Sequence, residues 1–148
     1  MKAAWLEFEA ALAPILRDLH REHPDLLRVR PEVDDPDLSA WVIDQEGDGT
    51  GTGILLQEGW TLPAAAVCEL ADTVQEAAQE AVWAKTGSGT WPGCPRHPNG
   101  HPLEPGLHLM TAVWICYPDN VIIAEIGALG IARSVADPSQ AGTARRRN

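Results

Sequence analysis

The sequence predicts a single α+β domain, and three observations support this fold class. Two segments repeat apolar residues with the period of an amphipathic helix, one near the N-terminus and one in the middle of the chain. Short apolar runs separated by turn residues lie between and after them, as in antiparallel strands. A length of 148 residues, of which 45% are hydrophobic, suits one domain with a buried core. We expect residues 1–133 to form this domain and residues 134–148, which lack periodicity, to form a disordered tail.

The first helix is predicted over residues 3–22. Its spacing of i, i+3, i+4 and i+7 is typical of a helix with one buried face, made of Trp5, Phe8, Leu12, Ile15, Leu16 and Leu19. Pro14 lies within this segment and removes one backbone donor, so we expect a kink or a late first turn there.

A three-stranded antiparallel meander is predicted from the runs 26–33, 38–46 and 53–59, which follow the first helix. Pro31 places the first run at a sheet edge, because proline cannot donate to a strand ladder. The glycine-rich connector 44–53 lacks the lysine of a phosphate loop, and Leu55 stands where a calcium loop needs glutamate. We interpret it as a flexible hairpin loop.

A long second helix is predicted within residues 60–87, with Thr61 as its N-cap, Pro63 in its first turn and Gly87 as its stop. One face of it is apolar, with Val67, Leu70, Val74, Ala78, Ala81 and Val82. The opposite stripe is acidic and is interpreted as a solvated face, with Glu69, Asp72, Glu76 and Glu80. Cys68 lies beside the apolar stripe, which predicts a small buried core residue.

The last third is predicted as a loop over residues 87–108 followed by a C-terminal β-hairpin. Its two strands are the apolar runs 109–118 and 121–130, and Asp119 and Asn120 provide turn chemistry between them. This hairpin could complete the sheet of the three earlier strands.

Charge and composition narrow the function classes. A net charge of −10 disfavours DNA or RNA, since nucleic-acid affinity depends on clustered Lys and Arg. No run of about 18 apolar residues occurs, so neither a membrane span nor a secretory segment is predicted, and we expect a cytoplasmic protein. In that compartment three reduced cysteines favour metal ligation or burial over a disulfide. The six tryptophans allow two interpretations. Trp60 or Trp91 could contact a protein partner, because tryptophan is enriched at interfaces, or the tryptophans could belong to the core.

The segment "CPRHPNGH" predicts a metal-binding loop within residues 90–118. Cys94 and His97 are separated by two residues, His101 follows after three more, and Cys116 comes from the next strand. Two thiols and two imidazoles form a complete Cys2His2 shell for zinc. The prolines that follow Cys94, His97 and His101 restrict the backbone, and Asn99 with Gly100 suits a tight turn between the imidazoles.

Several alternatives stay open for this loop. The fourth ligand is expected to be His101, with Asp119, His108 or water as the other candidates. The segment could also be a proline-stiffened loop without metal, or Cys94 and Cys116 could form a redox-linked pair.

The Cys-Pro-x-His turn ahead of a hairpin resembles half of a zinc ribbon, with histidine in place of the second cysteine of a knuckle. The second knuckle of a ribbon would place a cysteine where this chain has Asp119. Residues 90–127 also resemble short proteins of high-GC bacteria that share a Trp-Pro-x-Cys-Pro-x-His stretch and carry no assigned activity. The resemblance implies a metal-binding knuckle and no reaction.

Two function classes follow from the number of protein ligands. Four ligands close the shell, so that zinc would be structural and the protein an accessory or protein-interaction domain. Three ligands would leave a water for hydrolytic chemistry, with Glu104 or Glu125 as general base. Two thiolates and the lack of a His-Glu-x-x-His motif favour the closed site.

Overall fold

The computed structural model describes residues 2–31, 40–44, 51–54, 63–87 and 89–131, and within them the predicted α+β class is confirmed. The helices are α1 (Lys2–Glu22) and α2 (Pro63–Thr86). The strands are β1 (Leu27–Pro31), β2 (Ala40–Asp44), β3 (Gly51–Ile54), β4 (Glu104–His108), β5 (Thr111–Cys116) and β6 (Val121–Glu125). Thr61 and the predicted tail 134–148 lie outside the described residues.

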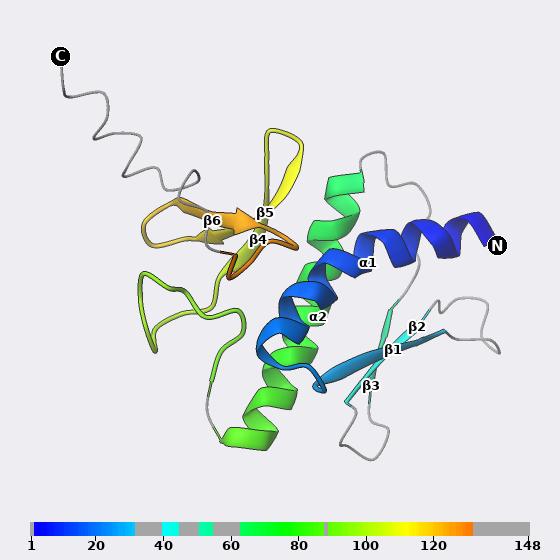
Figure 1. Ribbon diagram of the computed structural model, residues 1–148, viewed down its shortest axis with the longest axis horizontal. Helices are drawn as coiled ribbons and strands as arrows, with labels where there is room; N and C mark the ends of the chain where they lie inside the picture. Colours follow the sequence, from blue (N-terminus) through cyan, green and yellow to red (C-terminus); the bar gives the residue numbers. More distant parts are fainter. Residues whose placement is uncertain (1, 32–39, 45–50, 55–62, 88, 132–148) are drawn as a thin grey trace.

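The strands form two separate antiparallel sheets, ordered β1-β2-β3 and β4-β5-β6. Helix α2 contacts strands of both sheets, so it lies between them, with α1 crossing it (Figure 1). The predicted meander is therefore present, with Pro31 on an edge strand as expected. The expectation that the C-terminal hairpin completes this first sheet is wrong, because β5 and β6 pair with each other and with β4 instead.

Strand β4 is the element that the sequence did not predict. Its five residues, EPGLH, lie inside the loop predicted from the sequence. Pro105 and Gly106 favour a loop in such a prediction because both are unusual in strands. They are tolerated at the edge of this sheet, where β4 pairs along its length with β5. Leu109 and Met110, expected at the start of a strand, form the β4–β5 turn with φ angles of 46° and 63°.

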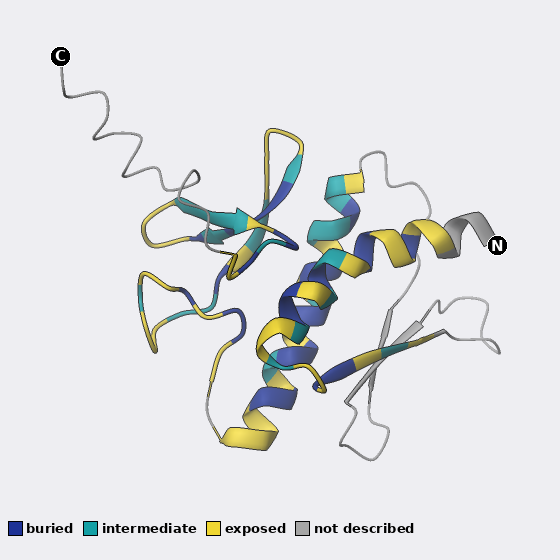
Figure 2. Cartoon of the chain, in the orientation of Figure 1, coloured by how far each residue is buried: buried dark blue, intermediate teal, exposed yellow. Residues whose placement is uncertain are grey.

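The core lies between the two helices, β1 and the second sheet (Figure 2). Phe8, Ile15 and Leu19 are fully buried on one face of α1, as the helical spacing predicted. Alanines on the facing side of α2 are buried too, and their small side chains let the helices pack closely. The acidic stripe of α2 is exposed. Helix α1 continues through Pro14.

A buried carboxylate fastens α1 to the second sheet. Asp18 is 1% exposed, and its oxygens accept hydrogen bonds from Trp114 Nε1 (2.8 Å) and from the backbone amides of Gly127 (2.6 Å) and Leu129 (3.0 Å). Arg21 lies 3.4 Å from the same carboxylate and donates to the Leu129 carbonyl at 2.6 Å. The segment after β6 is therefore held against α1 by backbone amides that donate to Asp18 and by a backbone carbonyl that accepts from Arg21.

Two tryptophans pack edge to face beside the candidate metal loop. The rings of Trp91 and Trp114 have centroids 5.6 Å apart and an interplanar angle of 81°. Both side chains are fully buried, so the hypothesis that Trp91 lies at an interface is wrong, and it belongs to the core. Trp60 lies outside the described residues. Neither helix in the described part of the chain has an apolar stretch long enough to span a membrane.

Candidate metal centre

The loop that carries the predicted ligands is closed by its own backbone. Residues Gly93 and Pro102 form an isolated antiparallel bridge, and the Leu103 amide donates to the Pro92 carbonyl at 2.7 Å. Between them, the Cys94 amide donates to the His101 carbonyl at 3.3 Å. The two arms of the loop therefore run side by side and bring both ends of the ligand motif together.

Two glutamines of α2 hold the ends of this loop. Gln75, which is buried, donates through Nε2 to the Leu103 carbonyl at 2.5 Å. Gln79, one turn later, donates to the Trp91 carbonyl at 3.3 Å. These amides satisfy carbonyls that the loop cannot pair internally. The sequence pattern did not reveal them, because a glutamine on a helix face gives no sign of its partner.

Two tight turns orient the side chains of Cys94, His97 and His101. The His97 amide donates to the Cys94 carbonyl at 3.2 Å, and the Gly100 amide donates to the His97 carbonyl at 2.9 Å. Asn99 has a φ of 59° and follows Pro98, the pattern of a type II turn with proline at its second position and a left-handed residue at its third. The predicted turn between the two imidazoles is confirmed.

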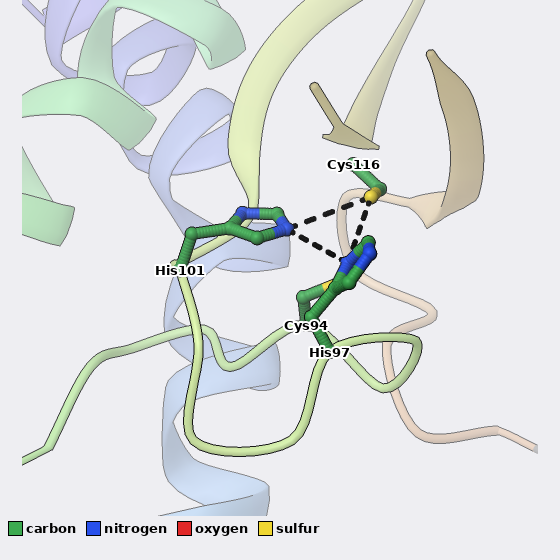
Figure 3. A group of neighbouring side chains, drawn as sticks. All are labelled: Cys94, His97, His101 and Cys116. Carbon is green, nitrogen blue, oxygen red and sulfur yellow. Dashed lines mark hydrogen bonds between the residues drawn. The ribbon is translucent and has the colours of Figure 1, made fainter. Parts of the chain in front are cut away.

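The four predicted ligand residues come together (Figure 3), with one ligand atom from each lying within 4.8 Å of all the others. His97 Nδ1 lies 3.6 Å from Cys94 Sγ, 3.5 Å from Cys116 Sγ and 3.1 Å from His101 Nε2. His101 Nε2 also lies 3.6 Å from Cys116 Sγ. Cys94, His97, His101 and Cys116 could therefore hold a metal ion.

The outward nitrogens of the two imidazoles face oxygen atoms. His101 Nδ1 lies 2.7 Å from the Pro102 carbonyl oxygen, which can only accept, so this nitrogen is the donor. His97 Nε2 lies 3.5 Å from Asp119 Oδ2. Both rings therefore direct their other nitrogen toward the two sulfur atoms, which is the orientation that metal-bound histidines adopt.

The two thiols of the cluster are buried, and neither forms a disulfide. Cys94 is 4% exposed and Cys116 is fully buried, and all three cysteines of the chain are free. Burial raises the pKa of the Cys116 thiol, against the effect of the Asp119 backbone amide, which hydrogen-bonds the sulfur. Cys68 lies outside the cluster and is only partly buried against the core, whereas a buried residue was predicted. Burial and the nearby carboxylates of Asp72 and Glu69 raise the pKa of its thiol.

Asp119 contacts the cluster through His97 but does not belong to it. Its Oδ2 accepts a hydrogen bond from Arg96 Nε at 2.7 Å, and this bond, followed by the charge of His97, lowers the pKa of the carboxyl. The same pair raises the pKa of Arg96. Arg96 lies between two ligands in the sequence, but its partner is 23 residues away, so the sequence alone did not identify the contact.

The remaining candidates also lie on the second sheet, where Glu104 pairs with Ile115 beside Cys116. His108 pairs with Thr111 at the far end of β5 from Cys116, about 17 Å away at roughly 3.3 Å per residue. Glu104 and Glu125 are exposed residues at the ends of β4 and β6. Of the candidates for the fourth ligand, His101 has a ligand atom within the cluster, whereas His108 lies at the other end of β5.

Comparison of the chain with family models gives no match, and comparison with curated proteins and with solved structures gives no significant match.

Proposed function

We propose that this protein is a small cytoplasmic accessory or protein-interaction domain whose fold is held by a structural zinc ion bound to Cys94, His97, His101 and Cys116. The observation that carries this proposal is the convergence of two thiols and two imidazole nitrogens from the loop and from β5. Such a site would contribute folding energy by joining a loop without regular structure to the second sheet.

The separations of the ligand atoms support zinc. Zinc bonds of about 2.3 Å to sulfur and 2.0–2.1 Å to nitrogen, at tetrahedral angles, place a sulfur and a nitrogen about 3.6 Å apart and two nitrogens about 3.3 Å apart. The three short sulfur–nitrogen distances here are 3.5–3.6 Å, and the nitrogen–nitrogen distance is 3.1 Å. Four of the six separations therefore match a tetrahedral zinc shell, and the other two are at most 4.8 Å.

The donor set supports a structural rather than a catalytic ion. Four protein atoms fill a tetrahedral shell, whereas a hydrolase keeps one position for water. The general bases considered for that alternative, Glu104 and Glu125, are exposed strand residues. The zinc-dependent hydrolase is therefore the weaker of the two proposals.

The resemblance to half of a zinc ribbon enters the proposal in the same sense. The turn from Cys94 to His97 serves as one knuckle, and Cys116, the last residue of β5, supplies a single sulfur ligand ahead of the next turn. Asp119, at the position of the second cysteine of that knuckle, contacts a ligand histidine instead.

An interaction role is supported by the β4–β5 turn. Leu109 and Met110 are 85% and 71% exposed, and both have positive φ angles, which bulky residues disfavour and which asparagine and glycine normally supply in such turns. Strain at an exposed apolar tip is more typical of a contact surface than of a turn selected for stability alone. We propose that this tip contacts a protein partner.

Metal analysis of the purified protein tests the zinc proposal. We expect one zinc ion per chain by elemental mass spectrometry, and its loss with unfolding in the variants Cys94→Ser, His97→Ala, His101→Ala and Cys116→Ser. Asp119→Ala should keep one zinc ion at saturating zinc. No bound metal, together with unchanged stability in all of these variants, would mean that the segment is a proline-stiffened loop.

A further inference from the structure

We propose that Asp119, held by Arg96, is a positioning residue for the metal ligand His97. It accepts the Nε2 proton of the imidazole and thereby leaves the Nδ1 lone pair for the metal. This inference rests on the proposed zinc site and concerns which nitrogen of His97 binds and how tightly, a question that the ligand set does not answer.

The first step of the argument is the geometry of His97. Its Nδ1 faces Cys94, His101 and Cys116, while Nε2, on the other side of the ring, lies 3.5 Å from Asp119 Oδ2. A slight approach converts this contact into a hydrogen bond, and the carboxylate can only accept. The imidazole is then a donor at Nε2 and a ligand at Nδ1.

The second step is the competing proton position. His101 donates through Nδ1 to the Pro102 carbonyl, so its Nε2 presents a lone pair 3.1 Å from His97 Nδ1. Without a metal, this lone pair favours a proton on His97 Nδ1, which would block the ligand atom. Asp119 opposes this by attracting the proton to Nε2, so it selects the tautomer that can bind.

The third step is what holds Asp119 in place. Its carboxylate follows β5 in the exposed 117–120 turn, and Arg96 lies in the ligand loop between Cys94 and His97. Their 2.7 Å contact therefore joins the ligand loop to the turn that follows Cys116. The arginine fixes the carboxylate oxygen that faces His97, as outer-shell groups commonly do for metal-bound histidines.

The test compares wild type with Asp119→Ala, Asp119→Asn and, as a matched control, Glu125→Ala, which removes an exposed carboxylate from the same sheet. Zinc affinity is measured by chelator competition. The nitrogen that carries the proton in His97 is read from long-range ¹H–¹⁵N correlation of the imidazoles. The tautomer is read in the metal-free form of each variant, because in the zinc-loaded form the metal holds Nδ1 and the proton is already on Nε2.

We expect Asp119→Ala to weaken zinc binding about 10- to 100-fold and the His97 proton to leave Nε2 in its metal-free form. Asp119→Asn keeps an acceptor oxygen and should restore the Nε2–H tautomer with an intermediate affinity, while Glu125→Ala should match wild type. An unchanged tautomer with affinity within about twofold of wild type would overturn the proposal.

The two proposals fail in different ways. If wild type binds no zinc, the proposed function is wrong, and the tautomer of His97 in the folded metal-free protein still decides the role of Asp119. If Asp119→Ala does not fold, Arg96→Gln replaces it, since this variant keeps the carboxylate and removes its clamp. We then expect a smaller loss of zinc affinity with a partial shift of the His97 proton away from Nε2, and no shift would refute the positioning role.

Discussion

Replacing Asp18 should destabilise the fold more than any substitution on the helix surfaces. The carboxylate is 1% exposed and accepts from the Trp114 indole and from the amides of Gly127 and Leu129. In Asp18→Ala these buried donors lose their acceptor, at about 1–3 kcal/mol each. Part of this cost is offset because the carboxylate no longer has to be desolvated.

The net loss for Asp18→Ala should be about 3–5 kcal/mol, the range for breaking one side of a buried charged network. Domains of this kind are stable by only about 5–15 kcal/mol, so the variant should unfold at a much lower denaturant concentration. Asp18→Asn keeps the volume and an acceptor for Trp114 and Gly127 but places an amide donor against the Leu129 amide, so part of the loss should remain. Its side chain cannot accept through both terminal atoms.

Urea unfolding followed by tryptophan fluorescence measures this loss, with zinc present in every sample. Asp72→Ala is the matched control, because it makes the same substitution on the exposed face of α2. It should change the free energy of unfolding by less than about 1 kcal/mol. A loss below about 1 kcal/mol for Asp18→Ala would refute the reasoning.

Three further predictions follow from the site and the turns. Burial raises the pKa of the Cys116 thiol, so zinc must displace a proton from this thiol at neutral pH. Zinc affinity should therefore rise by about tenfold per pH unit for each proton released, until the pH passes that pKa. A zinc affinity that does not change with pH in chelator competition would contradict this prediction. A Cβ at Gly100 would lie 2.9 Å from the backbone carbonyl oxygen of His97, whereas one at Gly93 would meet nothing within 4 Å. Gly100→Ala should therefore weaken zinc binding by about tenfold or more, and Gly93→Ala should leave it unchanged. Leu109→Asn combined with Met110→Gly should raise the free energy of unfolding by about 1 kcal/mol, because the strained turn gains residues that adopt positive φ; a lower value would count against strain there.

The helices and the ligand loop could be predicted because their signals are local. The helical period of the residues around Phe8 and Val74 depends only on which face is buried. Likewise, prolines and the Asn99–Gly100 pair determine turn geometry within a few residues. The gathering of all four ligand residues followed from spacing, since two tight turns bring a thiol and two imidazoles to one side of a loop.

The elements that were missed depend on partners far away in the chain. Strand β4 contains Pro105 and Gly106, and only its pairing with β5 makes it a strand. The separation into two sheets is decided by how both pack on α2, which no local pattern encodes. The contact of Arg96 with Asp119 likewise joins two turns that the folded sheet brings together.

The most direct test of the zinc centre is X-ray absorption at the zinc edge of the protein as purified. Two sulfur atoms at about 2.3 Å and two imidazole nitrogens at about 2.0–2.1 Å are expected, with no further oxygen ligand. This result would support a closed structural site held by Cys94, His97, His101 and Cys116. A shell with fewer than two sulfurs, or with a bound water in place of an imidazole, would contradict the account.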